Sequence, residues 1–240
     1  MTELLYQKDS YLKEFQANIT RVDPENHAII LDKTAFYPGG GGQPADSGWL
    51  VIGEATFPIK RARRAGADIL HIVESDPPLP ESGQVALGKL DWDRRYQLMR
   101  THTAMHILCG VIFRDYGASV TGGHMEPMSG RMDFEFETMR KELIQAIDTA
   151  INEEVANARP VKVDILPREE AFQIPDLIRT KINLLPEGIQ EVRVVEIAGL
   201  DIQADGGTHV KNTAEVGKIK IVDYKSKGKI NKRIYVNVED

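Results

Sequence analysis

Two histidines stand four residues apart in Thr101-His-Thr-Ala-Met-His106, and a third ends the motif Asp205-Gly-Gly-Thr-His209. Residues i and i+4 lie on the same face of a helix, so the imidazoles of His102 and His106 would point the same way. Such a pair chelates one metal ion if the fold brings a third ligand to it. The sequence therefore predicts one metal site built from His102, His106 and His209, on which function depends.

Two other interpretations of these histidines compete with metal binding. A single histidine is more often a core or surface residue than a ligand, but three of the six histidines fall in these two motifs. A zinc peptidase carries H-E-x-x-H, in which a glutamate beside the first histidine acts as general base. Thr103 holds that position, and no acidic residue lies between the histidines. The peptidase motif is therefore excluded.

A second segment of chemical interest is Phe36-Tyr-Pro-Gly-Gly-Gly-Gly-Gln-Pro-Ala-Asp-Ser-Gly48. A tight turn needs one or two glycines, whereas four in a row let the backbone approach a ligand or another domain and expose N–H donors. The flanking pairs Tyr37-Pro38 and Gln43-Pro44 favour a defined shape over a flexible loop. No Gly-Lys-Ser/Thr follows, so the segment is not a nucleotide-binding P-loop.

The bulk composition is that of an ordinary globular protein. The chain has 240 residues, 42% of them hydrophobic, and lacks the run of about 18 apolar residues that a membrane span needs. The N-terminus lacks the pattern of a signal peptide. The single cysteine, Cys109, cannot form an internal disulfide and is expected to be a core thiol. We expect a cytoplasmic protein of two domains with no membrane partner.

Basic residues are concentrated in two clusters, although the net charge is −6. One cluster spans residues 60–64 and the other spans residues 218–233. Either cluster alone is as well explained by a solvated surface. Two such clusters in an acidic chain favour a localised phosphate-binding surface, while the acidic net charge argues against a DNA-binding protein.

The elements that must position these motifs change in kind near residue 90. Before it, short apolar strands separated by turn residues are expected at 17–22, 27–31, 49–52, 55–57 and 69–73. This pattern predicts a small β-barrel over residues 1–89 that contains the glycine-rich segment. A loop is expected at 76–83.

From Asp91 the apolar spacing predicts a helix through about Tyr116, ended by Gly117, which carries both histidines. A second helix is expected to begin at Thr138 as N-cap, with Leu143, Ile147, Ile151 and Val155 on its apolar side. A short helix is expected near 168–172, and strands of one antiparallel sheet are expected at 131–136, 161–165, 192–197, 216–222 and 233–236. Because helices and strands do not alternate as βαβ, residues 90–240 are predicted to form an α+β domain.

Taken in order, these motifs resemble a known family. Phe36-Tyr-Pro-x-x-Gly-Gly-Gln43, His102-x-x-x-His106 and Gly206-Gly-Thr-His209 resemble the editing region of alanyl-tRNA synthetase. They are most similar to the free-standing AlaX family of alanyl-tRNA editing proteins, in the AlaX-M form that retains the glycine-rich N-terminal domain. Asp91-Trp-Asp-x-Arg-x-x-x-Met-Arg100 matches as well, so the resemblance covers nearly the whole chain. The chain is too short to add a synthetase's other domains, which implies trans-editing.

The resemblance implies an aminoacyl-tRNA deacylase that hydrolyses the ester between a wrong amino acid and the terminal adenosine of tRNA(Ala). Serine would be the main error and glycine the second. An alanine-sized pocket rejects them poorly, because an added hydroxyl is nearly isosteric and glycine only leaves space. A second site can bond the serine hydroxyl, since a buried polar group left unpaired by alanine costs about 1–3 kcal/mol. Thr34 is the candidate for this group; the alternative is an ordinary strand residue.

Further substrate contacts are expected from the glycine-rich segment and from the region after the first predicted helix. The candidates are Gly41, Gly42, Gln43, His124 and Arg131. Arg131 would help to position the adenosine. His124 is, on the simpler interpretation, a loop histidine.

In this family the metal ligands are the histidines of H-x-x-x-H and the cysteine and histidine of C-x-x-x-H. His102, His106 and His209 match, but Asp205 stands at the cysteine position. A carboxylate binds Zn²⁺ at about 2.0–2.2 Å, so one Zn²⁺ could be held by three histidines and Asp205. Alternatively, Asp205 is a catalytic base that orients the attacking water. An oxygen ligand would also weaken the preference for zinc over other divalent ions.

The partner implied by the resemblance is mischarged tRNA(Ala), held through phosphates by a basic C-terminal segment. The candidate residues are Lys225, Lys227, Lys229, Asn231, Lys232 and Arg233. Two interpretations of a different class stay open: a tRNA-binding module with a structural zinc, and a hydrolase of another small ester or amide, which the basic clusters disfavour. The oligomeric state is also left open by the sequence.

Overall fold

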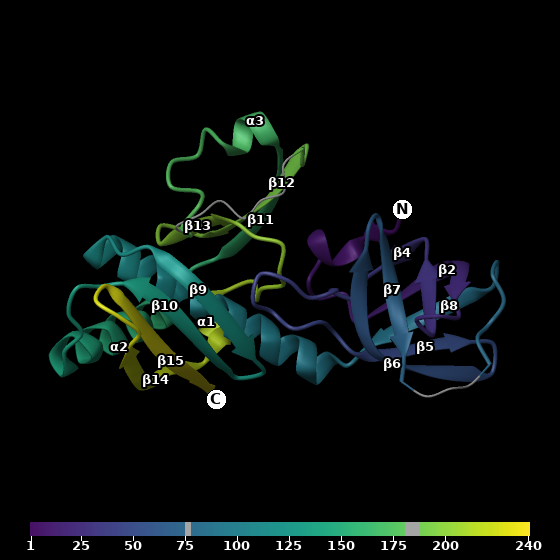
Figure 1. Cartoon of the computed structure of the whole chain (residues 1–240), viewed down its shortest axis with the longest axis horizontal. Helices are drawn as coiled ribbons and strands as arrows, with labels where there is room; N and C mark the ends of the chain where they lie inside the picture. Colours follow the sequence, from purple (N-terminus) through teal and green to yellow (C-terminus); the bar gives the residue numbers. More distant parts are fainter. Residues whose placement is uncertain (75–77, 181–187) are drawn as a thin grey trace. The chain divides into compact units, whose positions relative to one another are not determined.

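The computed structural model describes residues 1–74, 78–180 and 188–240, and the chain divides into two compact units, Met1–Gln97 and Leu98–Asp240 (Figure 1). The division lies inside helix α1 (Trp92–Tyr116), C-terminal of the 89/90 boundary that the sequence suggests. Helix α1 has the predicted ends, and Gly117 follows it with a φ of 63°. Of the loop expected at 76–83, residues 76 and 77 lie outside the described part of the chain.

The first unit contains a closed barrel of antiparallel strands, as the sequence predicts. Its neighbours run in the order β2-β3-β7-β6-β5-β8. The strands are β2 (Glu14–Asp23), β3 (Ala28–Leu31), β5 (Gly48–Ile52), β6 (Ala55–Ala65), β7 (Asp68–Val73) and β8 (Val85–Leu90). Along β2, Phe15, Ala17 and Ile19 are buried between exposed neighbours, so alternate side chains fill the core. The unit also contains a parallel pair, β1 (Glu3–Leu4) with β4 (Lys33–Thr34), and the 3-10 helix η1 (Leu5–Gln7).

Strand β6 is longer than the expected segment 55–57, and strand β8 is not indicated by the sequence pattern. The second half of β6 carries four exposed basic residues, Lys60, Arg61, Arg63 and Arg64. Ala62, which lies between them, is buried. A barrel strand can place charged residues outside at little cost. The charged stretch therefore conceals the two-residue period on which strand prediction depends.

The second unit is α+β, as predicted, but its strands form two antiparallel sheets, not one. The first sheet has the order β14-β15-β10-β9 and the second has the order β11-β12-β13. The elements are β9 (Val120–Glu126), β10 (Ser129–Glu135), α2 (Lys141–Ala156), β11 (Val161–Pro167), α3 (Arg168–Ala171), β12 (Glu191–Ile197), β13 (Asp201–Ala204), the 3-10 helix η2 (Thr213–Val216), β14 (Lys218–Ser226) and β15 (Asn231–Glu239). The single-sheet prediction is wrong because the strands choose separate partners: β12 pairs with β11 and β13, whereas β15 pairs with β10 and β14.

Helix α1 lies at the centre of the second unit, and every residue from Thr101 to Ile112 is buried. The four-stranded sheet crosses one side of the helix (Figure 1). There Gly130 of β10 packs so closely that a Cβ would lie 2.7 Å from the sulfur of Met105. On another side, a Cβ on Gly110 would lie 3.0 Å from the Cβ of Asp201 at the start of β13. These two close approaches fix the segment that carries the histidines.

Helix α2 does not begin where the sequence predicts. It starts at Lys141 after Arg140, which makes no side-chain cap hydrogen bond, so Thr138 is not the N-cap. The buried side of the helix contains Ile144, Ile147 and Ile151, spaced i, i+3, i+7. Packing of this apolar stripe, not the capping residue, therefore sets the start of the helix.

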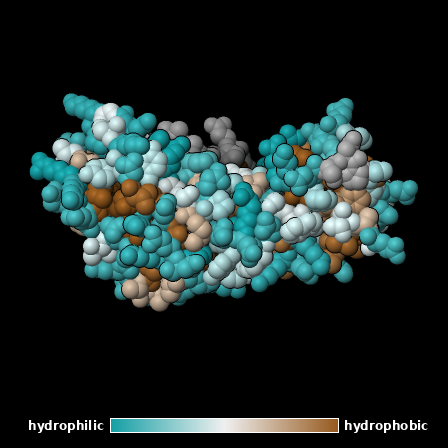
Figure 2. Space-filling model, turned by 90° about the horizontal axis from the view of Figure 1, so that it is seen from below, coloured by the Kyte–Doolittle hydropathy of each residue, from teal (hydrophilic) through white to brown (hydrophobic). Residues whose placement is uncertain are grey.

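The face drawn in Figure 2 is largely hydrophilic, with hydrophobic atoms confined to separate patches, as is usual for a folded chain. Among the described residues, no helix is both long enough and apolar enough to cross a membrane.

Candidate metal centre

Four side chains of the second unit meet at one buried point. His102 and His106 come from α1, while Asp205 and His209 come from the segment after β13. Each offers a nitrogen or oxygen ligand atom, and these atoms all lie within 4.8 Å of one another. Three of the residues are buried and Asp205 is nearly so. The structure thus brings together the four residues that the sequence and the resemblance single out, in a cluster that could hold a metal ion.

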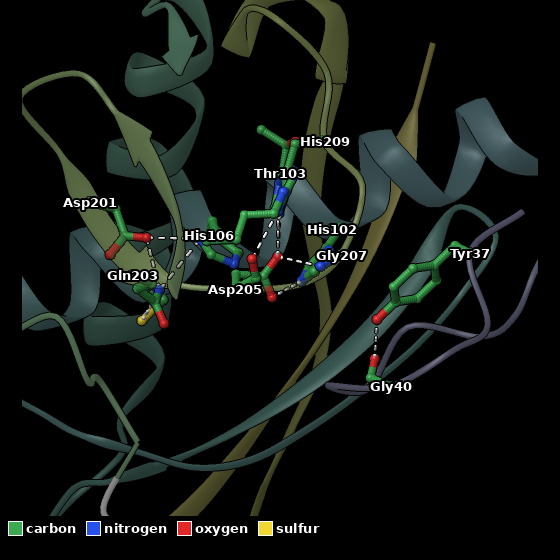
Figure 3. Close-up of polar contacts among 12 residues, drawn as sticks. Tyr37, Gly40, His102, Thr103, His106, Asp201, Gln203, Asp205, Gly207 and His209 are labelled. Atoms are coloured by element: carbon green, nitrogen blue, oxygen red, sulfur yellow. Dashed lines mark hydrogen bonds and ion pairs between the residues drawn. The ribbon is translucent and has the colours of Figure 1, made fainter. Parts of the chain in front are cut away.

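The three imidazoles are arranged around the Asp205 carboxylate (Figure 3). Nε2 of His209 lies 3.0 Å from Oδ2 of Asp205, and Nε2 of His102 lies 3.6 Å from Oδ1. The ring centres of His102 and His209 are 4.2 Å apart and those of His106 and His209 are 4.6 Å apart. Nitrogen and carboxylate oxygen atoms at one point form the donor set that Zn²⁺ and other first-row divalent ions accept.

Backbone contacts hold Asp205 in place. The N–H of Gly207 donates to Oδ2 of Asp205 over 2.7 Å, which closes a local turn. Arg193 of β12 donates from Nη1 to the Asp205 carbonyl over 2.9 Å, and its own carbonyl accepts the Asp205 N–H over 3.0 Å. The position of Asp205 therefore depends on the second sheet, while His102 and His106 depend on α1.

Contacts around the cluster also orient the imidazoles. Nδ1 of His106 lies 2.9 Å from Oδ2 of Asp201, and since a carboxylate only accepts, we place the proton on Nδ1. The amide of Gln203 donates to the same oxygen over 2.8 Å. The hydroxyl of Thr103 lies 3.2 Å from Nδ1 of His209. Because Nδ1 of His106 and Nδ1 of His209 each have a partner, Nε2 of each ring is the atom that could bind a metal, as is usual for metal-ligating histidines.

The electrostatics of the cluster favour the unprotonated forms of His102, His209 and Asp205 at neutral pH. Burial lowers the pKa of His102 well below its usual value and lowers that of His209 to about 4, although Asp205 opposes both shifts. Burial would also lower the pKa of His106, but the hydrogen bond and charge of Asp201 outweigh it and raise this pKa. Burial would raise the pKa of Asp205, but the neighbouring histidines, His102 foremost, lower it well below its usual value. Two neutral imidazoles beside an ionised carboxylate suit a divalent cation.

Three other residues that the sequence singles out lie apart from this cluster. Cys109 is a buried thiol, as expected; it accepts a hydrogen bond from Gln203 over 3.4 Å, and burial raises its pKa. Arg131 follows Gly130, whose missing side chain faces Met105 of α1, so Arg131 points to the outer face of the sheet. His124 pairs with Arg131 on the neighbouring strand β9, not in a loop, and about half of its side chain is exposed. The described contacts thus do not bring His124 or Arg131 to the cluster.

The glycine-rich segment has a defined shape in the first unit, as the sequence predicts. Gly40 and Gln43 exchange backbone hydrogen bonds of 3.0 and 2.9 Å. The Tyr37 hydroxyl donates to the Gly40 carbonyl over 3.0 Å (Figure 3). Glycines 39–42 all have positive φ values between 56° and 144°, which L side chains rarely adopt. The run of four glycines is therefore required by the backbone.

A buried ion pair holds both ends of this segment. The Arg95 guanidinium is completely buried; it pairs with Asp46 and donates to the carbonyls of Ser10 and Ala35. Asp46 also accepts the Tyr37 N–H over 2.6 Å. Arg95 thus joins Ala35, which precedes the glycine-rich segment, to Asp46 near the C-terminal end of the segment.

Thr34 is completely buried, and its hydroxyl already has partners. It lies 2.8 Å from Nε2 of His71, whose Nδ1 lies 2.9 Å from the Ile29 carbonyl. The hydroxyl also accepts the N–H of Phe36 over 3.1 Å. These contacts give Thr34 a structural task, and a substrate hydroxyl would have to compete with them.

The basic C-terminal segment forms the end of the β14–β15 hairpin. Its residues are not equally available to a partner: Nζ of the buried Lys232 donates to the carbonyls of Gly228 and Lys229, and Arg233 makes two hydrogen bonds of 2.7 and 2.8 Å to Asp133. Lys225 forms an ion pair with Asp223 over 3.0 Å. The other candidates differ, because Lys227 and Lys229 are exposed and Asn231 accepts a hydrogen bond from Thr121.

Sequence reasoning did not find the residues that surround the cluster. They are Thr103, Asp201, Gln203 and Arg193. Within the first unit, the Asp46–Arg95 pair was not found either. Thr103 sits inside the histidine motif, which is a usable signal. Asp201 and Gln203 lie two residues apart on strand β13, just before Asp205, so their side chains share one face; this is a weaker signal.

Comparisons with known proteins agree with this arrangement. A family model for tRNA synthetases class II (A) matches residues 6–94, and one for the threonyl and alanyl tRNA synthetase second additional domain matches residues 192–235. The alanyl-tRNA editing protein AlaX-M of Saccharolobus solfataricus is 45% identical over the full length of both chains. The chain belongs to the AlaX-M family of alanyl-tRNA editing proteins. AlaX-M of Methanosarcina barkeri is 38% identical, again over both full lengths.

The family also has longer relatives. An alanine–tRNA ligase of Ignicoccus hospitalis is 35% identical over 92% of this chain, and the match covers 24% of that ligase. The chain is therefore similar to about a quarter of a much longer ligase, which is the relation that the sequence motifs suggest.

Proposed function

We propose that this chain is a trans-editing aminoacyl-tRNA deacylase that hydrolyses mischarged tRNA(Ala), with Ser-tRNA(Ala) as main substrate and Gly-tRNA(Ala) as second. The observation that carries the proposal is the buried cluster of three histidines and Asp205 in a chain that matches alanyl-tRNA editing proteins over its whole length. The first unit would act as the domain that carries the glycine-rich segment, and the second as the metal-binding editing domain.

We propose one Zn²⁺ per chain, held by His102, His106, Asp205 and His209. The fit is supported by four donors within 4.8 Å, by the lowered pKa values of His102 and His209, and by the fixed Nδ1 proton of His106. A bound Zn²⁺ supplies a Lewis acid that polarises an ester carbonyl, positions the aminoacyl group or makes a bound water more acidic. Fixed partners on the two Nδ1 atoms would keep the ligands aligned without further rearrangement.

Asp205 is better suited to ligation than to proton transfer. A general base is most effective when its pKa is near the working pH. The neighbouring histidines hold the pKa of Asp205 well below its usual value, so it would accept a proton from water only weakly. Oδ2 is also held by the Gly207 N–H. We therefore assign Asp205 to metal binding and not to proton transfer.

We propose that the glycine-rich segment, through Gly41, Gly42 and Gln43, contributes to binding of the aminoacyl end. Thr34 is retained as the serine-sensing candidate on condition that its hydroxyl can leave His71. Thr34→Ser keeps the hydroxyl and Thr34→Val removes it, so the pair isolates that group. Unchanged preference for serine over alanine in a folded Thr34→Val protein would assign Thr34 to structure alone.

We propose that the exposed lysines of the β14–β15 hairpin, Lys227 and Lys229, contact tRNA phosphates. Lys225, Asn231, Lys232 and Arg233 would support the hairpin more than the partner, because each has an internal contact. A phosphate would have to displace Asp133 from Arg233 or backbone carbonyls from Lys232. An unengaged cation gives up only water to bind a phosphate.

The test is deacylation of Ser-, Gly- and Ala-tRNA(Ala) by the zinc-loaded full chain. We expect rapid loss of serine and glycine but not of alanine, abolished by His106→Ala in a protein that remains folded. His124→Ala is the matched control, because this exposed histidine lies on the outer face of the sheet, and it should keep activity. A zinc-loaded protein that hydrolyses neither serine nor glycine but binds tRNA would instead support the binding-module alternative.

A further inference from the structure

The two oxygens of the buried Asp201 carboxylate have different surroundings. Oδ2 accepts hydrogen bonds from His106 and Gln203, as Figure 3 shows. Oδ1 is buried and makes no hydrogen bond among the described residues. The group that faces it is the guanidinium of Arg179, whose Nε lies 3.7 Å away. Asp201 is therefore placed between a positive side chain and a candidate metal ligand.

Arg179 is itself a buried cation. Only 9% of its side chain is exposed, and its guanidinium lies 3.7 Å from the centre of the Phe113 ring on α1. Its Nε and Nη1 atoms have no hydrogen-bond acceptor within the described part of the chain, and its guanidinium forms an ion pair with Asp201. Arg179 and Asp201 both line a pocket of about 260 Å³ at the turn between β12 and β13.

A buried carboxylate needs such a counter-charge. Oδ1 of Asp201 has no hydrogen bond to hold it among the described residues, so without the guanidinium of Arg179 the buried carboxylate would be uncompensated and its side chain could turn away. If the Asp201 side chain turned, Oδ2 would no longer accept the Nδ1–H of His106. The imidazole would then lose the partner that fixes its tautomer and presents Nε2 to the cluster.

We propose that Arg179 is a positioning residue for the metal centre, acting through Asp201 on His106. The inference rests on the proposed function in one respect, the assignment of His106 as a metal ligand. Arg179 compensates the charge of Asp201, Asp201 holds the Nδ1 proton of His106, and His106 presents Nε2. Gly110 contributes space, because a Cβ there would lie 3.0 Å from the Cβ of Asp201 and 2.9 Å from the Cγ of Leu200.

The alternative task of Arg179 is packing on Phe113, which predicts lower stability without a specific loss of metal affinity. The packing role and the positioning role are distinguished by zinc affinity, measured by competition of the full chain with a zinc chelator. The variants are Arg179→Gln, Arg179→Lys, Asp201→Asn and the Arg179→Gln/Asp201→Asn double variant. Arg114→Gln is the matched control, because it also removes a guanidinium from a buried carboxylate, Glu154, at a distance from Asp201 along the chain.

We expect Arg179→Gln to weaken zinc binding about tenfold and Asp201→Asn about 10- to 100-fold, the range for outer partners of metal-ligating histidines. The double variant should bind zinc no more weakly than Asp201→Asn, since Arg179 acts only through Asp201. Arg179→Lys keeps the charge and should recover most of the affinity, and Arg114→Gln should match the wild type.

Zinc affinity of Arg179→Gln equal to that of the wild type, or strictly additive losses in the double variant, would overturn the proposal. If Arg179→Gln does not fold, Gly110→Ala tests the same chain of contacts by displacing Asp201: unchanged affinity there would overturn it as well. A wild-type protein that binds no zinc would remove the proposed metal centre, and this inference with it. If the wild type binds zinc and Arg179→Gln binds it equally well, only the role of Arg179 is refuted and the proposed metal centre stands.

Discussion

Replacing Arg95 with methionine removes the guanidinium that joins the two ends of the glycine-rich segment. Methionine fills much of the same space, so the change tests charge and hydrogen bonding more than volume. In the variant the buried Asp46 carboxylate keeps the Tyr37 N–H but loses its counter-charge. The Ala35 and Ser10 carbonyls lose their donor as well.

The magnitude follows from these contacts. Breaking a buried ion pair by removing one partner costs about 3–5 kcal/mol, because the remaining charge is left uncompensated. We expect about 4 kcal/mol for Arg95→Met, a large part of the roughly 5–15 kcal/mol that stabilises a typical domain. With a urea dependence of about 2 kcal/mol per molar for a unit of this size, the unfolding midpoint should fall by about 2 M.

Tryptophan fluorescence isolates this unit, because both tryptophans of the chain, Trp49 and Trp92, lie within Met1–Gln97. The control is Arg63→Met, which removes an exposed guanidinium that donates to Asn26 over 2.6 Å and should cost less than about 1 kcal/mol. A midpoint shift for Arg95→Met no larger than that of the control would refute the reasoning. Adding Asp46→Asn should recover part of the loss, since it removes the uncompensated charge.

Three further predictions concern pH, salt and metal. Burial lowers the pKa of His71 to about 4, below the value of about 6.5 expected in the unfolded chain, so its contribution is complete above pH 6.5 and is lost as the pH falls toward 4. Unfolding titrations should show a loss of up to roughly 3 kcal/mol from this residue across that window, and the loss should be absent in a His71→Gln variant. In filter-binding titrations with tRNA, replacing Lys227 and Lys229 with alanine should reduce the slope of log K against log salt by about 0.9 per phosphate contact, whereas Arg233→Ala should leave it unchanged; equal slopes for all variants would contradict the assignment. Chelator treatment should lower the melting temperature of the zinc-loaded wild type but not that of His209→Ala, and identical shifts would argue against ligation by His209.

The sequence predicted those parts of the fold in which one local pattern dominates. Helix α1 has a long apolar period ended by Gly117, and β2 alternates buried and exposed residues over its length. The partition of the C-terminal strands into two sheets is not a local property. It depends on which strand edges meet, and a sequence pattern describes faces, not edges.

The same limit applies to the candidate site. The residues that meet at the cluster could be named from the sequence because their types and spacings are unusual for ordinary helices and turns. Asp201 and Arg179 could not be named from the sequence. Asp201 contacts a histidine 95 residues away in the chain, and Arg179 stands in no motif that would distinguish it from other arginines. The Arg95–Asp46 pair joins residues 49 positions apart and was equally hidden. The sequence also does not show which face of a strand His124 and Arg131 occupy, because that depends on β10 packing against α1.

The absence of a thiolate from the cluster has a consequence for redox chemistry. A cysteine ligand is open to oxidation, first to a sulfenic acid and then irreversibly, and each step expels the metal. Asp205 has no such chemistry, and the one cysteine, Cys109, is buried with a raised pKa, so it carries little thiolate to react. Peroxide and alkylating reagents should therefore leave this centre intact under conditions that would inactivate one built with a cysteine at the same position.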